Sequence, residues 1–175
     1  LPRRTQIPGA EHVHDSEYFL NMPRIPDRIL FIGGGYISFE FAHVAIRAGA
    51  KRVTILHRSS QPLKAFDQDV VEVVLEASKA EGIEVVLNDS PVSVETSENG
   101  LLIQGSKGVG YRADLVIEAT GRTPDLKVLE GGHGKVEYSS AGIIVNEFLQ
   151  SASNPRVYAI GDCTATKYML ATVAD

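Results

Sequence analysis

The chain has 175 residues, 43% hydrophobic and 22% charged, a composition typical of one globular domain or of one domain with pieces of another. The net charge is −5 and the sequence has no basic stripe that could neutralise phosphates, which argues against nucleic acid as the main partner. No apolar run approaches the roughly 18 residues of a membrane span and no signal-peptide pattern is present, so we expect a cytoplasmic protein without a membrane partner. The single cysteine, Cys163, excludes an internal disulfide and a multi-cysteine metal cluster.

The first 27 residues are rich in proline and polar groups, which predicts a connecting segment that enters a domain rather than forming it. One short helix is expected there, around Asp15 to Leu20. The chain starts without a methionine and ends at Asp175 in a helix-like stretch. We therefore expect it to be a piece of a longer protein.

Residues 28–58 predict a strand, a turn, a helix and a second strand. A short apolar run, Ile29 to Ile32, meets three glycines, and a helix-like stretch ends at Gly49 before a second apolar run, Val53 to Leu56. This order is typical of the βαβ unit of a dinucleotide-binding fold.

The glycines of this unit each have a physical task. Gly33 permits the tight exit from the strand, and Gly35 lets the backbone approach a pyrophosphate at the positive end of the helix. Ser38 stands where the pattern needs a third small residue for close packing of helix on strand. The alternative is a tight turn with a purely structural role.

Two helices are expected in this part of the chain, about 36–48 and from Asp67, as N-cap, to a stop at Gly82. Helical spacing predicts that one apolar stripe of the first helix lies in the core: Ile37, Phe41 and Val44.

Residues 84–87 predict a third strand, and residues 92–112 an antiparallel three-stranded meander with a turn at Asn99-Gly100. Asp114 to Glu118 would return to the parallel sheet. The expected fold class is thus α/β, a Rossmann-like domain with a parallel sheet and a three-stranded meander. Two later strands are expected, Ile143 to Val145 and a buried one from Val157 to a turn at Gly161.

The end of the second strand favours one nicotinamide cofactor over the other. A carboxylate there would bond the ribose 2′-hydroxyl of NAD, but none occurs from Val53 to Ala65. The chain offers His57 and Arg58 instead, with Lys64 six residues beyond Arg58. This pattern favours NADPH over NADH, and the alternative is a solvated basic loop.

Four motifs stand in a particular order: Ile-Pro-Gly at 7–9, Gly-Gly-Gly-Tyr-Ile-Ser-Phe-Glu at 33–40, Ala-Thr-Gly-Arg-Thr-Pro at 119–124, and Tyr-Ala-Ile-Gly-Asp at 158–162. Together they resemble the pyridine nucleotide:disulfide oxidoreductases, the flavoprotein family of glutathione reductase, mercuric reductase and dihydrolipoamide dehydrogenase. The resemblance covers essentially the whole chain.

The resemblance implies an NAD(P)H-binding domain, residues 26–124, inserted into an FAD-binding domain. Residues 1–25 and 125–175 would belong to the flavin domain or to linkers. The family's first glycine motif, its redox-active cysteine pair and its interface domain with the catalytic histidine have no counterpart here. The chain should therefore bind nucleotide without completing a turnover.

The resemblance also implies roles near the nicotinamide. Tyr36 matches an aromatic gate that covers the flavin face, and Glu40 matches a glutamate that pairs with a lysine of the flavin domain. Arg58 and Lys64 match basic residues that hold the 2′-phosphate in glutathione reductase. The alternatives are a packed aromatic residue at Tyr36 and a solvated carboxylate at Glu40.

Two further motifs complete the expected site. Thr120, Gly121 and Arg122 end a parallel strand, the edge where open α/β sheets bind ligands, and would lie beside the nicotinamide. Gly161 and Asp162 resemble the motif whose aspartate bonds the ribityl chain of FAD, although a simple turn is the alternative. The expected cofactor-binding residues are Gly33, Gly35, Tyr36, Ile37, Ser38, Glu40, His57, Arg58, Lys64, Thr120, Gly121, Arg122, Gly161 and Asp162.

These features imply an FAD-dependent oxidoreductase that passes hydride from NADPH to FAD and on to a disulfide or similar acceptor. The FAD and interface domains of the same full-length chain would be its partners, in a homodimer. An NADH-dependent relative, another flavin reductase and a non-catalytic dinucleotide-binding module are the alternatives. The histidines show no metal-ligand spacing, so no metal is expected.

Overall fold

The computed structural model describes residues 1–165. The helix expected near Asp175 lies outside the described residues. Two compact units are present: residues 2–121 form one, and Leu1 with the chain from Arg122 onward forms the other. No helix within residues 1–165 is long and apolar enough to cross a membrane.

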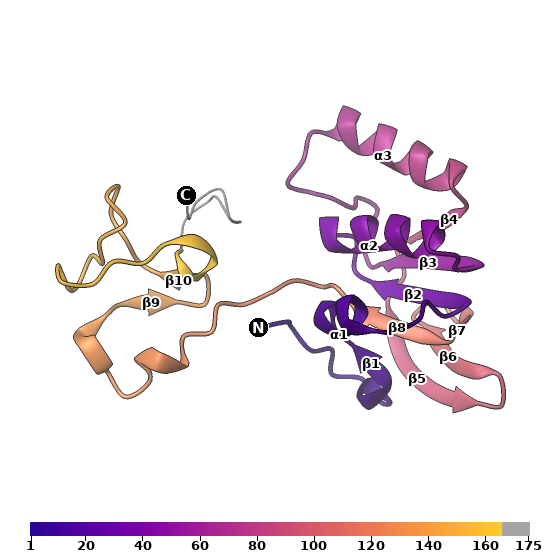
Figure 1. Ribbon diagram of the computed structural model, residues 1–175, viewed down its shortest axis with the longest axis horizontal. Coiled ribbons are helices and arrows are strands. Elements are labelled where there is room, and N and C mark those ends of the chain that lie inside the picture. Colours follow the sequence, from indigo (N-terminus) through magenta and orange to yellow (C-terminus); the bar gives the residue numbers. More distant parts are fainter. Residues whose placement is uncertain (166–175) are drawn as a thin grey trace. The chain divides into compact units, whose positions relative to one another are not determined.

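The first unit is built on a five-stranded parallel sheet (Figure 1). Its strands are β1 (Val13–His14), β2 (Arg28–Ile32), β3 (Arg52–His57), β4 (Ile83–Leu87) and β8 (Leu115–Glu118). They stand in the order β1-β8-β2-β3-β4, so β2 is central and its Phe31 pairs with Ile55 and Ile117. The carboxyl ends of all five strands therefore meet at one edge, as the sequence predicted for a nucleotide-binding sheet.

Three helices belong to this unit: α1 (Ser16–Asn21), α2 (Tyr36–Arg47) and α3 (Gln68–Ala80). The predicted N-cap of α3 is confirmed, because the carboxylate of Asp67 accepts from the backbone N–H group of Asp69. Asp15 caps α1 in the same way, since its carboxylate accepts from the Tyr18 N–H. A short 3-10 helix, η1 (Ala10–His12), precedes β1.

The predicted meander is confirmed as a three-stranded antiparallel sheet of β5 (Pro91–Ser97), β6 (Gly100–Gly105) and β7 (Gly110–Ala113). Gly100 opens β6 with φ of 102°, a conformation that favours glycine after the tight turn. Successive residues of the central strands point to opposite faces of the parallel sheet. Ile29 and Phe31 pack with the helices, whereas Leu30 and Ile32 pack with the meander.

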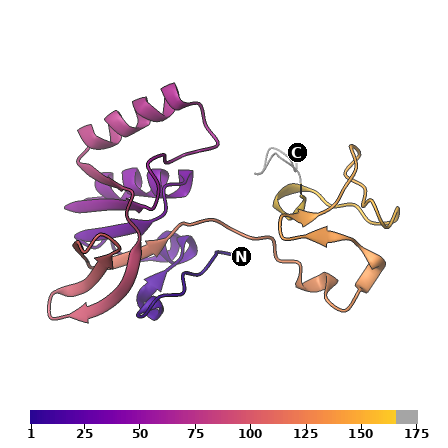
Figure 2. The ribbon, with the colours of Figure 1, turned by 180° about the vertical axis from the view of Figure 1, so that it is seen from behind.

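The unit thus has three layers, helices, parallel sheet and meander, which the two opposite views show (Figures 1 and 2). The α/β fold class predicted from the sequence is confirmed. Burial of both faces explains why the strands read as apolar runs rather than as alternating patterns.

The predicted core face of α2 is wrong by one residue. Val44 is 53% exposed, and Ile37 and Phe41 are only half-buried. The completely or almost completely buried positions of this helix are Ser38, Phe39, Ala42 and Ala45. Three of these four residues have small side chains, which allows the helix to lie close to the sheet, while Ile37, Phe41 and Val44 lie beside this face.

The prediction that residues 1–27 only connect is also wrong. Val13 in β1 pairs with Val116 of β8 and is 5% exposed, and Phe19 in α1 stacks on Phe41 with ring centroids 4.6 Å apart. The predicted short helix itself is confirmed as α1. A two-residue strand among prolines carries no periodic signal, which is why the edge strand escaped prediction.

The second unit has little regular structure in the described residues. Its elements are η2 (Lys127–Leu129), η3 (His133–Lys135), β9 (Tyr138–Ser139), β10 (Gly142–Ile143) and η4 (Gly161–Cys163). The predicted strand at 143–145 is reduced to β10, which pairs with β9. The predicted strand from Val157 is wrong, since within residues 1–165 that stretch makes one isolated bridge, from Tyr158 to Gln150.

Candidate dinucleotide-binding site

The turn after β2 is formed by Gly33, which has φ of 112°. A Cβ atom at this position would lie 2.6 Å from the carbonyl oxygen of Ala119 at the end of β8. The Gly33 N–H donates to the carbonyl oxygen of Leu56 on β3 at 2.9 Å. Both the backbone conformation and the contact therefore require glycine here.

Gly35 is the N-cap of α2 and has no side chain to cap the helix. The first N–H groups of a helix lack intrahelical acceptors, so this end presents free donors and the positive end of the helix dipole. The nearest atom to a Cβ at Gly35 would be the Ala119 carbonyl oxygen at 3.8 Å, an ordinary contact distance, so this position is not crowded. This geometry suits a pyrophosphate group.

Ser38 is completely buried within the first turns of α2. Its Oγ is a buried polar side-chain atom that has no hydrogen-bond partner in the part of the chain that the structure describes. The side chain therefore packs the helix against the sheet and presents nothing to a ligand in this conformation.

His57 is the last residue of β3, and its ring is half-buried below the glycine turn. Its Nε2 lies 3.1 Å from the Gln61 carbonyl oxygen and 2.8 Å from the Ser59 hydroxyl. Burial lowers the pKa of His57, the bond to Gln61 opposes this, and the charges of Lys64 and Arg58 lower it further. The imidazole is therefore neutral at pH 7 and donates from Nε2 to the Gln61 carbonyl.

The basic side chains of Arg58 and Lys64 are exposed at the two ends of a loop, residues 58–64. Neither forms an ion pair with a carboxylate of residues 1–165. Leu63 anchors this loop with φ of 50°, a strained value for a non-glycine residue, and its N–H donates to the Gly34 carbonyl at 2.8 Å. The loop is thus joined directly to the glycine turn.

Glu118 ends β8 at the same edge and is 4% exposed. Its carboxylate accepts from the Thr120 hydroxyl at 2.9 Å and from the Thr5 N–H at 2.7 Å. The Arg3 N–H donates to the Gly121 carbonyl at 3.0 Å. The loop predicted to border the nicotinamide is therefore held against the incoming N-terminal segment.

The structure gathers most of the predicted site residues at the carboxyl edge of the parallel sheet. The members within the first unit are Gly33, Gly35, Tyr36, Ile37, Ser38, Glu40, His57, Arg58, Lys64, Thr120 and Gly121. Tyr36 is 38% exposed, and Glu40 is exposed one turn further along α2. Arg122, Gly161 and Asp162 belong to the second unit, where Gly161 is buried with φ of 70°.

Sequence reasoning missed three residues that shape this edge: Gly34, Gln61 and Glu118. The run of three glycines could have indicated Gly34, but the contact that restricts it comes from a ring more than 20 positions away. Gln61 acts through its backbone carbonyl, which no side-chain pattern reveals. Glu118 continues an apolar strand, so its burial had no local signal.

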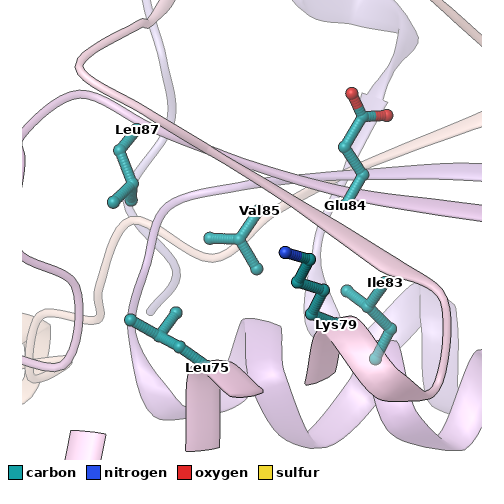
Figure 3. A pocket seen from close by; sticks show the side chains of 6 residues that line it. All are labelled: Leu75, Lys79, Ile83, Glu84, Val85 and Leu87. Carbon is teal, nitrogen blue, oxygen red and sulfur yellow. The ribbon is translucent and has the colours of Figure 1, made fainter. Parts of the chain in front are cut away.

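A separate groove of about 440 Å³ lies between α3 and the exposed edge strand β4. Figure 3 shows the side chains of Leu75 and Lys79 reaching from α3 toward Val85 on the strand. The other lining residues are Ile83, Glu84 and Leu87, and none of the six is a predicted site residue. Within residues 1–165 no cluster of histidine, cysteine and carboxylate side chains could hold a metal ion.

The whole chain, residues 1–175, matches the pyridine nucleotide-disulphide oxidoreductase family. The chain belongs to this family. The resemblance read from its four motifs is therefore confirmed, and family membership implies the use of FAD and a nicotinamide nucleotide. The Gly33–Gly35 turn and the open N-terminus of α2 fit the pyrophosphate of such a nucleotide.

Curated relatives in the family include enzymes named for different substrates. The chain is 34% identical over 163 residues to glutathione reductase from Burkholderia cepacia, covering 93% of this chain and 36% of the relative. It is 31% identical over 154 residues to dihydrolipoyl dehydrogenase from Bacillus subtilis, covering 87% of this chain and 33% of the relative. The chain thus spans about a third of the length of these relatives.

Two solved structures of one oxidase are also similar. The water-forming NADH oxidase from Lactobacillus brevis, bound to NADH, is 26% identical with a TM-score of 0.80, covering 99% of this chain and 42% of the oxidase. Its engineered form, a water-forming NADPH oxidase bound to NADPH, is 27% identical with a TM-score of 0.81 and the same coverage. Among the engineered changes, an aspartate, an alanine and a methionine in succession become alanine, arginine and serine, and a proline six positions after that alanine becomes arginine.

Proposed function

We propose that this chain is the NADPH-binding part of a flavin-dependent oxidoreductase that transfers hydride from NADPH to FAD and on to a disulfide acceptor. The observation that carries the cofactor choice is the loop after β3. It presents Arg58 and Lys64 without an ion-pair partner in residues 1–165, and no carboxylate occurs in residues 53–65. Two unpaired cations beside a phosphate-binding turn suit the 2′-phosphate of NADPH.

The engineered oxidase supports this proposal by its pattern of substitution. Arginine followed by serine, with a second arginine six positions after the first, distinguishes the engineered NADPH oxidase from the NADH oxidase. This chain has a similar arrangement in Arg58, Ser59 and Lys64, with lysine in place of the second arginine. His57 stands directly before Arg58, where the oxidase lost its aspartate.

The residues of this chain would act by binding and orientation. The N–H groups at the start of α2 would hold the pyrophosphate, and Arg58 with Lys64 would hold the 2′-phosphate. Tyr36 would cover the flavin until the nicotinamide displaces it, while Glu40 would pair with a flavin-domain lysine. The bound cofactors supply the hydride chemistry.

The roles proposed for the residues from Thr120 onward follow the same resemblance. Asp162, after the buried Gly161, would bond the ribityl chain of FAD, and Thr120 to Arg122 would border the nicotinamide. We propose that residues 26–124 are the NADPH-binding insert and that the flanking residues belong to the flavin domain. The full-length protein is proposed to be a cytoplasmic homodimer.

The second candidate is an NADH-dependent enzyme of the dihydrolipoyl dehydrogenase type. The similarity to the Bacillus subtilis enzyme, 31% against 34% for glutathione reductase, favours neither substrate. The basic loop favours NADPH, since a site for NADH alone places a carboxylate on the ribose hydroxyl.

The test is to replace Arg58 with glutamine in the full-length protein and to measure the dissociation constants of NADPH and NADH. Loss of a charge-assisted contact should weaken NADPH about 10- to 100-fold and leave NADH within about twofold. Arg47→Gln is the matched control, because Arg47 is an exposed arginine at the opposite end of α2. Equal losses for both cofactors in Arg58→Gln would contradict the proposal.

A further inference from the structure

We infer that His57 is a positioning residue for NADPH selectivity, because its ring fixes the basic loop 58–64 against the glycine turn. The inference rests on the proposed NADPH site but assigns His57 a role other than direct contact with the cofactor. Four contacts of the described residues carry it, and they form a closed circuit between β3, the glycine turn and the loop.

The first contact joins the ring to the turn. A Cβ built on Gly34 would lie 2.6 Å from Cγ and 2.7 Å from Nδ1 of His57, and the third nearest atom is also in that ring. Gly34 does not have a positive φ, so its backbone would accept alanine. A side chain at position 34 would therefore have to displace the imidazole, which occupies the space of its Cβ.

The second and third contacts join the same ring to the loop. Nε2 donates to the Gln61 carbonyl at 3.1 Å, and the Ser59 hydroxyl lies 2.8 Å from Nε2. The Ser59 hydroxyl also donates to the Gln61 carbonyl at 3.3 Å. The centre of the loop is thus hydrogen-bonded to the His57 ring, and this ring packs against Gly34 in the glycine turn.

The fourth contact closes the circuit, because the Leu63 N–H donates to the Gly34 carbonyl at 2.8 Å. Lys64 follows Leu63 directly and Arg58 follows His57 directly. Each of these two cationic residues therefore directly follows a residue, His57 or Leu63, whose position the four contacts fix. The distance of the Arg58 and Lys64 side chains from the proposed pyrophosphate position at the start of α2 then depends on His57.

This arrangement affects the two cofactors differently. NADPH and NADH share the pyrophosphate, which the glycine turn would bind, but only NADPH carries the 2′-phosphate that the loop would bind. Loosening the loop should raise the entropy lost when Arg58 and Lys64 close on the phosphate. A change at His57 should therefore weaken NADPH selectively.

The experiment measures the dissociation constants of NADPH and NADH for the full-length protein and for His57→Ala, Gly34→Ala and the double variant. His57→Ala should weaken NADPH about three- to tenfold and NADH less than twofold, as for loss of one or two hydrogen bonds. Gly34→Ala should displace the ring and give a similar selective loss. In the double variant the two losses should not add, because the methyl group then fills the space left by the ring.

Two variants serve as controls. His43→Ala removes another half-buried histidine that makes a side-chain hydrogen bond, 3.1 Å to Ser78, and should leave the ratio of the two constants unchanged. His57→Gln keeps a donor for the Gln61 carbonyl without the ring and should lose less NADPH affinity than His57→Ala. It also provides the measurement if the alanine variant fails to fold.

Equal weakening of NADPH and NADH in the His57 variants, or additive losses in the double variant, would overturn the inference. If Arg58→Gln is selective for NADPH while the His57 variants are not, only the role of His57 fails. If Arg58→Gln is itself unselective, the proposed cofactor assignment fails instead.

Discussion

At the scale of single residues, Asp89 shows how one buried carboxylate fixes the meander. Its side chain is 1% exposed and accepts from the Ser106 hydroxyl and the Tyr111 hydroxyl, each at 2.7 Å, and from the N–H groups of Ser90 and Lys107. Burial alone would raise the pKa of Asp89, but these bonds outweigh it and lower the pKa to about 2. The charged form is therefore strongly favoured in the folded protein.

Replacing Asp89 with asparagine should lower the free energy of unfolding by about 1–3 kcal/mol, because one acceptor oxygen becomes a donor facing other donors. Since the folded pKa lies below the unfolded value of 3.8, the carboxylate contributes stability above pH 4 that is lost as the pH falls toward about 2. Urea unfolding at pH 7 and at pH 3 measures both effects.

The matched control is Glu98→Gln, an exposed carboxylate in the turn before β6. This variant should unfold like the natural protein at both pH values. An Asp89→Asn protein that keeps the full loss of stability between pH 7 and pH 3 would show that other groups cause the acid sensitivity.

Single residues of the candidate dinucleotide-binding site differ in how far the sequence predicts them. Gly33, Gly35, Arg58 and Lys64 were predicted because backbone freedom and charge are properties of the residue itself. The function of Gly34 could not be predicted, because the ring of His57 that restricts it belongs to another strand. For His57 the residue was predicted, but the sequence could not indicate that its ring packs below the turn.

At the scale of elements, helix starts and stops were predictable because caps are local signals. The core face of α2 was not, since three of its four buried residues, Ser38, Ala42 and Ala45, are small, and Phe39 is the fourth. Hydrophobic periodicity selects the larger residues, whereas close approach of a helix to a sheet selects small ones. At Val157 to Ile160 the apolar composition predicted a strand, but in the described residues this stretch makes one isolated bridge, between Tyr158 and Gln150, and composition does not indicate the extent of pairing.

Ser38 tests this packing account. Ser38→Ala should leave the free energy of unfolding unchanged or raise it by up to about 1 kcal/mol, because it removes a buried hydroxyl that has no partner within residues 1–165. Ser38→Leu should lower it by about 1–3 kcal/mol through overpacking against the sheet. Chemical denaturation distinguishes the two, and a loss above 1 kcal/mol in Ser38→Ala would mean that the hydroxyl has a stabilising partner.

At the scale of the whole molecule, the fold class followed from the order of strands, helices and turns, and the family from four spaced motifs. Edge strand β1 was missed because pairing of two residues with β8 is a long-range event without a local pattern. The second unit offers few periodic segments, so composition could predict turns there but not their pairing. The proposed choice of NADPH rests on one short loop, residues 58–64, which makes it testable on the intact protein.

The most direct test is anaerobic reduction of the bound flavin in the full-length protein by NADPH and by NADH under the same conditions. Two correctly placed cations on the 2′-phosphate predict that NADPH reduces the flavin with kcat/KM at least about tenfold higher than NADH. Equal values, or faster reduction by NADH, would contradict the assignment of Arg58 and Lys64 to the 2′-phosphate.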